Sequence, residues 1–224
     1  MTSSPTAIRH EHPLLGAPRR DVITTVLLSL LTAVMFVLVA LHTTGAAIQR
    51  VDDRFLKFMV ENRSSSATAV AKVLNILGLV YVTLPARVAV AVFLAVRRRW
   101  WHLAAFVGAV VLSEVCIGPI KALYARPRPP ASLVHTSGAS FPSGHAVAAS
   151  VTVVGAVIAL FPEGGKRYAW GAAAVAFSLV MGLSRAYLGA HWLSDAVAGT
   201  LLGTSIALGT AVVIHFVRER TRAG

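Results

Sequence analysis

The stretch SRAYLGAHWLSD, residues 184–195, places a cation, an imidazole and a carboxylate beside a long apolar segment. His191 and Asp195 are four residues apart, so at the start of a helix they share one face. The carboxylate can then hold one ring nitrogen while the other ring nitrogen faces a substrate. Arg185 precedes them across a turn that contains Gly189, and its planar guanidinium is suited to gripping an anion. The pattern favours phosphate chemistry, although a hydrogen-bonded helix end would also produce it.

The composition of the chain indicates a membrane protein. Of its 224 residues 56% are hydrophobic and only 13% are charged, which is too apolar for a domain with a solvated surface. The net charge is +12, but the basic residues stand in short clusters between apolar runs, so we expect no nucleic-acid partner. The single cysteine, Cys116, excludes an intramolecular disulfide and a cysteine metal cluster.

The apolar runs predict an all-α, polytopic fold with six transmembrane helices. The expected spans cover residues 22–41, 77–96, 100–124, 144–160, 170–188 and 191–216, and the second is expected to bend near Pro85. We expect residues 1–20 to be a cytoplasmic N-terminal segment, residues 21–216 to be one membrane domain, and residues 217–224 to be a basic cytoplasmic tail.

A short amphipathic helix on the membrane surface is predicted after the first span. Charged residues occupy one face of this segment and apolar residues recur at helical spacing on the other. The charged set is Arg50, Asp52, Asp53 and Lys57, and the apolar set is Ile48, Val51, Phe55, Phe58 and Met59.

The basic clusters predict the orientation in the membrane. If the N-terminus is cytoplasmic, six spans place the clusters at residues 19–20, 97–99, 166–167 and 218–222 on one side, which is the positive-inside pattern. We therefore expect a protein of the inner or plasma membrane, with residues 184–195 on the periplasmic or extracellular side.

Two other stretches have the chemistry of an anion site. KALYARPRPP, residues 121–130, holds three cations among stiffening prolines, although cations that snorkel to lipid headgroups would explain it equally. In FPSGHA, residues 141–146, Ser143 is expected to cap a helix that Gly144 opens. The unpaired backbone N–H groups of such a helix start bind anions, and His145 lies in its first turn.

In chain order the three stretches read K-x6-R-P, P-S-G-H and S-R-x5-H-x3-D. This resembles the type 2 phosphatidic acid phosphatase family, whose tripartite signature also occurs in soluble vanadium haloperoxidases. Every signature position is matched; Arg126 and Pro127 form a second Arg-Pro pair, and the family spacing favours Arg128. The resemblance implies that His191 is the nucleophile, Asp195 its orienting partner and His145 the general acid. It also implies a phosphate-binding set consisting of Lys121, Arg128, Ser143, Gly144 and Arg185.

The resemblance implies an integral membrane phosphatase that acts on a lipid phosphate or diphosphate, such as phosphatidic acid, phosphatidylglycerol phosphate or a polyprenyl diphosphate. A neutral imidazole can attack phosphorus to give a phosphohistidine, which water then hydrolyses. No cofactor or metal is expected, because Asp52 and Asp53 lie in a different loop and Asp195 is committed to His191. The expected partner is the lipid substrate in the membrane, and no obligate protein partner is inferred.

Two other function classes stay open from the sequence. A lipid phosphotransferase would use the same phosphohistidine but pass the phosphoryl group to an acceptor other than water. A non-catalytic transporter or lipid-binding protein is disfavoured by the complete signature.

Two further patterns lie inside the spans. Arg87 and Glu114 lie at similar depths on antiparallel neighbours, and since charges in a membrane are costly we expect them to pair, with a water-filled cavity as the alternative. Gly199, Gly203 and Ala207 recur at four-residue spacing, which predicts close helix packing.

Overall fold

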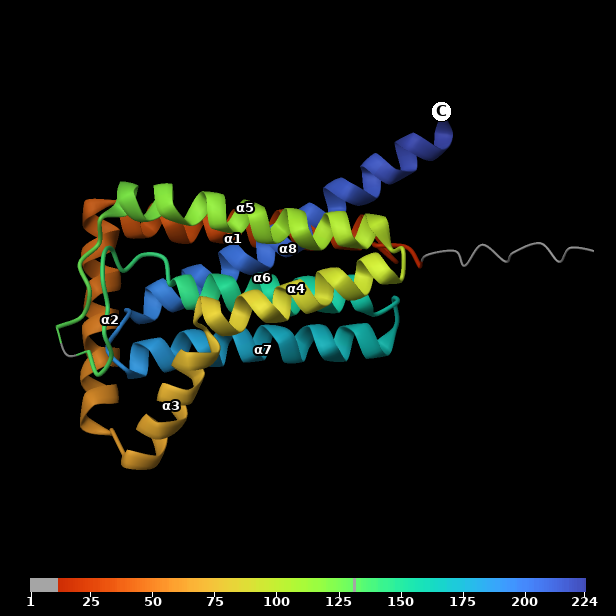
Figure 1. Ribbon diagram of the computed structural model, residues 1–224. Helices are drawn as coiled ribbons and strands as arrows, with labels where there is room; N and C mark the ends of the chain where they lie inside the picture. Colours follow the sequence, from red (N-terminus) through yellow and green to blue (C-terminus); the bar gives the residue numbers. More distant parts are fainter. Residues whose placement is uncertain (1–11, 131) are drawn as a thin grey trace, which may run out of the picture.

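The computed structural model describes residues 12–130 and 132–224, and within them it contains eight α-helices and no strand. The predicted all-α class is therefore confirmed, while residues 1–11 of the predicted N-terminal segment lie outside the described residues. Figure 1 shows most helices running side by side in a bundle, with α2 lying across one end. In chain order the helices are α1 (Pro18–Ala40), α2 (His42–Glu61), α3 (Ser65–Leu77), α4 (Val80–Val96), α5 (Trp100–Tyr124), α6 (Gly144–Leu160), α7 (Gly165–Tyr187) and α8 (Leu193–Ala223).

Four helices, α1, α5, α7 and α8, are long and apolar enough to cross a membrane. The pair α3 and α4 meets the same criterion when taken together, as one span bent by 53°, which raises the number to five. Helix α6 is apolar but only 17 residues long. The chain is thus a multi-pass membrane protein with four to five clear crossings, and the sixth crossing, by α6, stays a prediction.

The bend in the second span does not lie where the sequence placed it. Pro85 is inside the continuous helix α4, and the break falls between α3 and α4 at residues 78–79. Gly78 ends α3 directly against the ring of His145, where an added Cβ would stand 2.2 Å from the ring Cδ2 atom. The bend therefore lies where the end of α3 closely approaches His145 at the start of α6. This contact cannot be predicted from the sequence around Pro85.

Helix α2 forms where the amphipathic helix was predicted, but its charged face is not uniformly outward. Val51 and Phe58 stay more than half exposed, whereas Asp52 is only 1% exposed. Asp52 turns into the bundle because it contacts Arg126 and Ser194 there, so its predicted place on the outer polar face is wrong.

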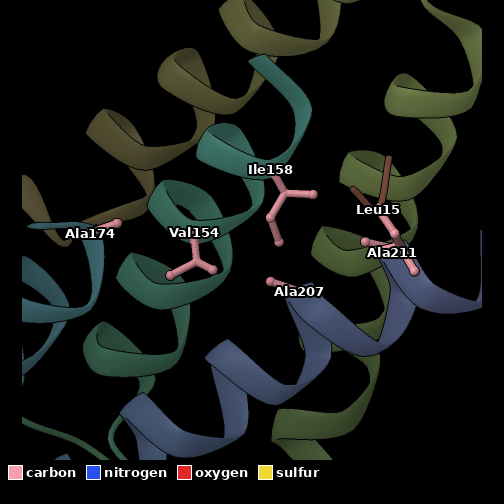
Figure 2. Packing of buried hydrophobic residues seen from close by; sticks show 6 residues of the cluster. All are labelled: Leu15, Val154, Ile158, Ala174, Ala207 and Ala211. Atoms are coloured by element: carbon pink, nitrogen blue, oxygen red, sulfur yellow. The ribbon is translucent and has the colours of Figure 1, made fainter. Parts of the chain in front are cut away.

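The bundle packs around α6. Figure 2 shows Val154 and Ile158 of α6 among small residues of α7 and α8, with Leu15 closing the cluster. Between α6 and α8, a Cβ at Gly199 would stand 2.7 Å from the Ser143 carbonyl oxygen, and one at Gly203 would stand 2.7 Å from that of Val147. The predicted close packing along the last helix is confirmed, and it holds the start of α6 against the start of α8.

The charged pair inside the spans is also confirmed. Arg87 Nη1 lies 2.7 Å from Glu114 Oε1, and Arg87 Nε donates to Thr152 Oγ1 at 2.9 Å. Three neighbouring helices, α4, α5 and α6, are thus joined at this depth by polar contacts.

The basic clusters gather at the end of the bundle opposite α2 (Figure 1). Arg20 contacts Glu163 and Tyr168, and Arg99 donates to the Leu160 carbonyl at 3.5 Å, so the start of α1 and the α4–α5 and α6–α7 turns meet there. These clusters share one end, as the positive-inside pattern requires.

Candidate active site

The three signature stretches meet at the end of the bundle that α2 crosses. Lys121 lies in the last turn of α5, Ser143 directly precedes α6, and Arg185 lies in the last turn of α7. His191 precedes α8, and Asp195 lies in its first turn. The Ser143 N–H donates to the Asp195 carbonyl at 3.0 Å, which ties the second stretch directly to the third.

The imidazole of His191 lies between a carboxylate and a guanidinium. Its Nδ1 is 3.4 Å from Asp195 Oδ2, a charge contact longer than a well-formed hydrogen bond. Its Nε2 is 3.3 Å from Nη1 of Arg128. A guanidinium can only donate, so this contact assigns the lone pair to Nε2 and the proton to Nδ1. The nitrogen that faces Arg128 thus carries the lone pair.

The environment of His191 keeps its ring neutral. The side chain is 3% exposed, and this burial lowers the pKa of the imidazole to about 4. The nearby charges of Arg128 and Arg185 lower the pKa further, while Asp195 acts in the opposite direction. A neutral imidazole at physiological pH has a lone pair for attack, as nucleophilic catalysis requires.

Arg128, in the loop between α5 and α6, donates to carbonyl groups of its own loop and of the loop between α7 and α8. Its Nη1 donates to the Ala190 carbonyl at 2.7 Å, next to its contact with His191. The other guanidinium nitrogens donate to carbonyls of residues 137–139 at 2.8–3.2 Å. Lys121 Nζ donates to one of the same carbonyls, that of Ala139, at 2.7 Å. The two cations are therefore anchored side by side.

Besides Nδ1 of His191, two buried donors at the site have no hydrogen-bond partner among the described residues. They are the Ser143 hydroxyl, which does not cap the backbone of α6 as predicted, and Nε of Arg185. A buried polar group without a partner costs free energy. An anion in the site would supply acceptors for both. A cleft of about 540 Å³ opens beside Lys121, lined by the end of α5 and the loop that follows.

Asn75 of α3 joins two signature residues and was missed in the sequence. Its side-chain oxygen accepts from Arg185 Nη1, and its backbone carbonyl lies 3.2 Å from His145 Nε2. No signal around Asn75 marks it, because α3 approaches α6 and α7 only through tertiary packing.

The two Arg-Pro pairs have different surroundings. Arg128 faces His191, whereas Arg126 donates to Asp195 Oδ1 at 2.8 Å and to Asp52 Oδ2 at 2.7 Å. Of the two arginines, Arg128 is thus the one in contact with His191, and its role in binding phosphate stays a prediction. The structure corrects the view that Asp52 lies in a separate loop, because α2 folds back over the site and brings Asp52 to Arg126. The repeated Arg-Pro pair was the available signal for Arg126.

Among the described residues, no group of three or more His, Cys, Asp or Glu side chains is arranged to hold a metal ion. The buried carboxylates nearest the site, those of Asp52 and Asp195, both bind Arg126.

Comparison with known proteins gives both a family and a fold. The family model described as the PAP2 superfamily matches residues 102–221, more than half of the chain. Two curated relatives, the lipid A 1-phosphatases of Rhizobium johnstonii and Rhizobium etli, are each 39% identical over 79 residues, or 35% of this chain. The matched region spans 30% and 31% of those two proteins, about a third of their length.

Two solved structures share the fold. The first transmembrane PAP2 type phosphatidylglycerolphosphate phosphatase from Bacillus subtilis superposes with a TM-score of 0.73 at 24% identity, covering 88% of this chain and 96% of that one. Aquifex aeolicus LpxE superposes with a TM-score of 0.57 at 21% identity, covering 70% and 92%. At these identities the likeness establishes the architecture.

Proposed function

Because the chain belongs to the PAP2 superfamily, we propose that it is a membrane phosphatase that hydrolyses the phosphate or diphosphate headgroup of a lipid. One observation carries the proposal: a neutral, buried His191 whose nucleophilic nitrogen faces Arg128 and whose other nitrogen faces Asp195. The site lies at the end of an apolar bundle, where a lipid headgroup would meet it. The names of the relatives and of the solved neighbours agree with this class of substrate.

The proposed reaction has two displacements. In the first, His191 Nε2 attacks phosphorus, the bond from phosphorus to the lipid oxygen breaks, and His145, which must begin in its protonated form, gives that oxygen a proton and becomes neutral. In the second, His145 takes a proton from water, the water oxygen bonds to phosphorus, and the nitrogen–phosphorus bond breaks to release phosphate. Asp195 stabilises the positive charge that the imidazole gains on forming the phosphohistidine.

The proposed phosphate site consists of the five residues that the signature implies. Phosphoryl transfer depends on positioning and on neutralising the equatorial oxygens, and Lys121, Arg128 and Arg185 supply positive charge for that. The Ser143 hydroxyl and the Gly144 N–H add donors at the start of α6. The unpartnered Ser143 hydroxyl and Arg185 Nε would gain acceptors on the phosphate.

The proposed substrates are phosphatidic acid, phosphatidylglycerol phosphate, a polyprenyl diphosphate and, from the curated relatives, lipid A. We place the site on the periplasmic or extracellular face, because the basic clusters lie at the opposite end of the bundle. The enzyme would then act on headgroups of the outer leaflet.

The proposal is tested by incubating the purified, detergent-solubilised protein with each of these lipids and measuring inorganic phosphate. We expect release from at least one lipid in the presence of EDTA, and inhibition by vanadate, whose five-coordinate form resembles the transition state. His191→Ala should lower the rate at least about a thousandfold. His135→Ala, a change at an exposed histidine of the nearby loop, is the matched control and should leave the rate unchanged.

Three outcomes would overturn the proposal. Near-normal turnover by His191→Ala would exclude the phosphohistidine. Activity that EDTA removes and magnesium restores would require a metal mechanism. Transfer of the phosphoryl group to a second lipid, with no release of inorganic phosphate, would identify a phosphotransferase.

A further inference from the structure

Arg126 forms a bridge between two buried carboxylates that come from different ends of the chain. Its Nη1 binds Asp195 Oδ1 at 2.8 Å and the Ser194 hydroxyl at 2.6 Å. Its Nη2 binds Asp52 Oδ2 and the Gln49 side-chain oxygen, both at 2.7 Å. The two carboxylates are almost fully buried, and the Arg126 side chain is 11% exposed. All the contacts have the short distances of charge-assisted hydrogen bonds.

Asp52 binds the start of α8 as well as Arg126. Its Oδ1 accepts from the Ser194 N–H at 2.9 Å, and its Oδ2 accepts from the Ser194 hydroxyl at 2.6 Å. Ser194 lies in the first turn of α8, where backbone N–H groups lack partners within the helix. A carboxylate on α2 thus caps the helix that carries Asp195, one turn from the His191 ring.

The charges of the three buried groups do not cancel. Asp52 and Asp195 each carry a negative charge and Arg126 one positive charge, so the trio keeps a net charge of about −1 if all three are ionised. If Asp52 were absent, Arg126 would pair with Asp195 alone and neutralise the carboxylate that faces His191. With Asp52 present, the guanidinium of Arg126 pairs with both carboxylates, so it neutralises the charge of Asp195 only in part. The remaining negative charge can stabilise the protonated imidazole of His191.

We propose that Arg126 and Asp52 are positioning residues of the reaction. Arg126 fixes Oδ1 of Asp195, the carboxylate oxygen that does not face His191. Asp52 offsets the positive charge of Arg126, so that Asp195 can stabilise the charge that His191 gains. Helix α2 would then be part of the catalytic apparatus, although none of its residues belongs to the proposed phosphate-binding set. This inference rests on the proposed function, because it assigns these residues to the reaction of His191.

The proposal predicts an order of His191 pKa values that a purely structural role would not produce. Removing the cation with Arg126→Met leaves two carboxylates, so the pKa of His191 should rise. Removing the carboxylate with Asp52→Asn leaves Arg126 to neutralise Asp195, so the pKa should fall. The double variant restores the net charge of the trio and should return the pKa close to the wild-type value. We expect each single shift to be about one unit, with opposite signs.

The other charged groups around His191 are the same in every variant. They are Arg128 of the loop, Arg185 of α7, His145 of α6 and Asp195 itself, with Lys121 of α5 acting on Asp195. Their effects therefore cancel when the variants are compared. Asp53→Asn is the matched control, because it removes the same charge from the adjacent, exposed position of α2 and should leave the pKa unchanged.

The measurement is NMR titration of histidine-labelled protein in detergent, with the His191 signal assigned by its loss in His191→Gln. The proposal is supported if the pKa of His191 is highest in Arg126→Met, intermediate in the wild type and the double variant, and lowest in Asp52→Asn. Equal pKa values in all variants, or shifts of the same sign, overturn it. Arg126→Met is the variant at greatest risk of misfolding. If it does not fold, Asp52→Asn and the charge-balanced double variant still test the sign of the shift in the His191 pKa.

Kinetics supply the second readout. With para-nitrophenyl phosphate, Arg126→Met and the double variant should lower kcat about 10–100-fold while KM changes less than about twofold. Losses of this size are typical when a residue that orients a reacting group is removed. Arg128→Met, which removes a proposed phosphate contact, should raise KM instead. A rise in KM for Arg126→Met equal to that for Arg128→Met would make Arg126 a phosphate ligand and overturn the proposal. If the wild-type protein hydrolyses no substrate, the proposed function fails, whereas the NMR order still tests the charge network.

Discussion

At the scale of single residues, the proposed reaction requires His191 to be neutral. Burial lowers the pKa of this imidazole to about 4, so the nucleophilic lone pair is present through the physiological range. The folded state therefore binds a proton less readily than the unfolded chain. The stability that this contributes is present above the unfolded value of about 6.5 and is lost as pH falls toward 4.

This burial predicts the pH profile of the free enzyme. With para-nitrophenyl phosphate, whose leaving group needs no general acid, kcat/KM corrected for substrate ionisation should stay level down to about pH 5. It should then fall with an apparent pKa near 4, the value of His191. Thermal stability measured over the same range should decline between pH 6.5 and 4. An acid limb near pH 6.5 would show that the imidazole is solvated like one in a peptide.

At the scale of elements, the residues beside the break between α3 and α4 contact the candidate site. It brings Asn75 to His145 and Arg185, and it leaves no room for a side chain at Gly78. The shape of this broken helix therefore limits where the ring of His145 can lie.

Gly78→Ala tests this contact. The new Cβ would stand 2.2 Å from the His145 ring, which must move away from the position from which we propose that it protonates the leaving group. We expect kcat on a lipid substrate to fall at least about tenfold, while the midpoint of thermal unfolding changes little because a side chain can yield. Gly118→Ala on α5 is the control, since a Cβ there meets no atom within 4 Å. Equal activities of the two variants would show that His145 does not depend on this approach.

A second prediction concerns the link between α4 and α5. Arg87→Met and Glu114→Gln should each lower thermal stability in detergent, because each leaves a charge without the partner that lies 2.7 Å away. The double variant should lose less than the sum of the two, with a coupling of about 0.5–3 kcal/mol. Arg87→Met combined with Glu163→Gln, at the far end of the bundle, should be additive. Additive losses for the Arg87 and Glu114 pair would mean that the contact contributes nothing.

At the scale of the whole molecule, the end that carries the site and the end that carries the basic clusters lie opposite each other (Figure 1). Single crossings by α1, the α3–α4 pair, α5, α6, α7 and α8 would place both described ends of the chain on the same side. In that arrangement the bent pair counts once, and treating α3 and α4 as two crossings would invert every later helix.

Single cysteines can test the orientation. In a Cys116→Ser background, a cysteine at the exposed Ser137 lies at the site end and one at the exposed Gly165 at the basic end. A membrane-impermeant maleimide added to intact cells should label position 137 and spare position 165. Both should react once the cells are opened. Labelling of position 165 alone in intact cells would place the site in the cytoplasm.

The sequence by itself determined the features that depend on neighbours along the chain. Runs of apolar residues predict the membrane helices, because backbone N–H and C=O groups inside a bilayer must form their hydrogen bonds within the same helix. The three signature stretches predict His191, Asp195, Arg128 and the other candidate site residues, since each stretch combines its groups within a few positions at a helix end. The pair of Arg87 and Glu114 followed from counting residues in both directions from the turn near Arg99.

Only the tertiary structure decided which distant groups complete the site. Asp52 reads as one charge of an amphipathic helix, and its role depends on α2 folding across the end of the bundle to meet Arg126 and Ser194. Asn75 and the bend at residues 78–79 likewise depend on how α3 packs against α6 and α7. These contacts join residues more than sixty positions apart, and their energies come from burial and charge pairing that exist only after the helices have packed.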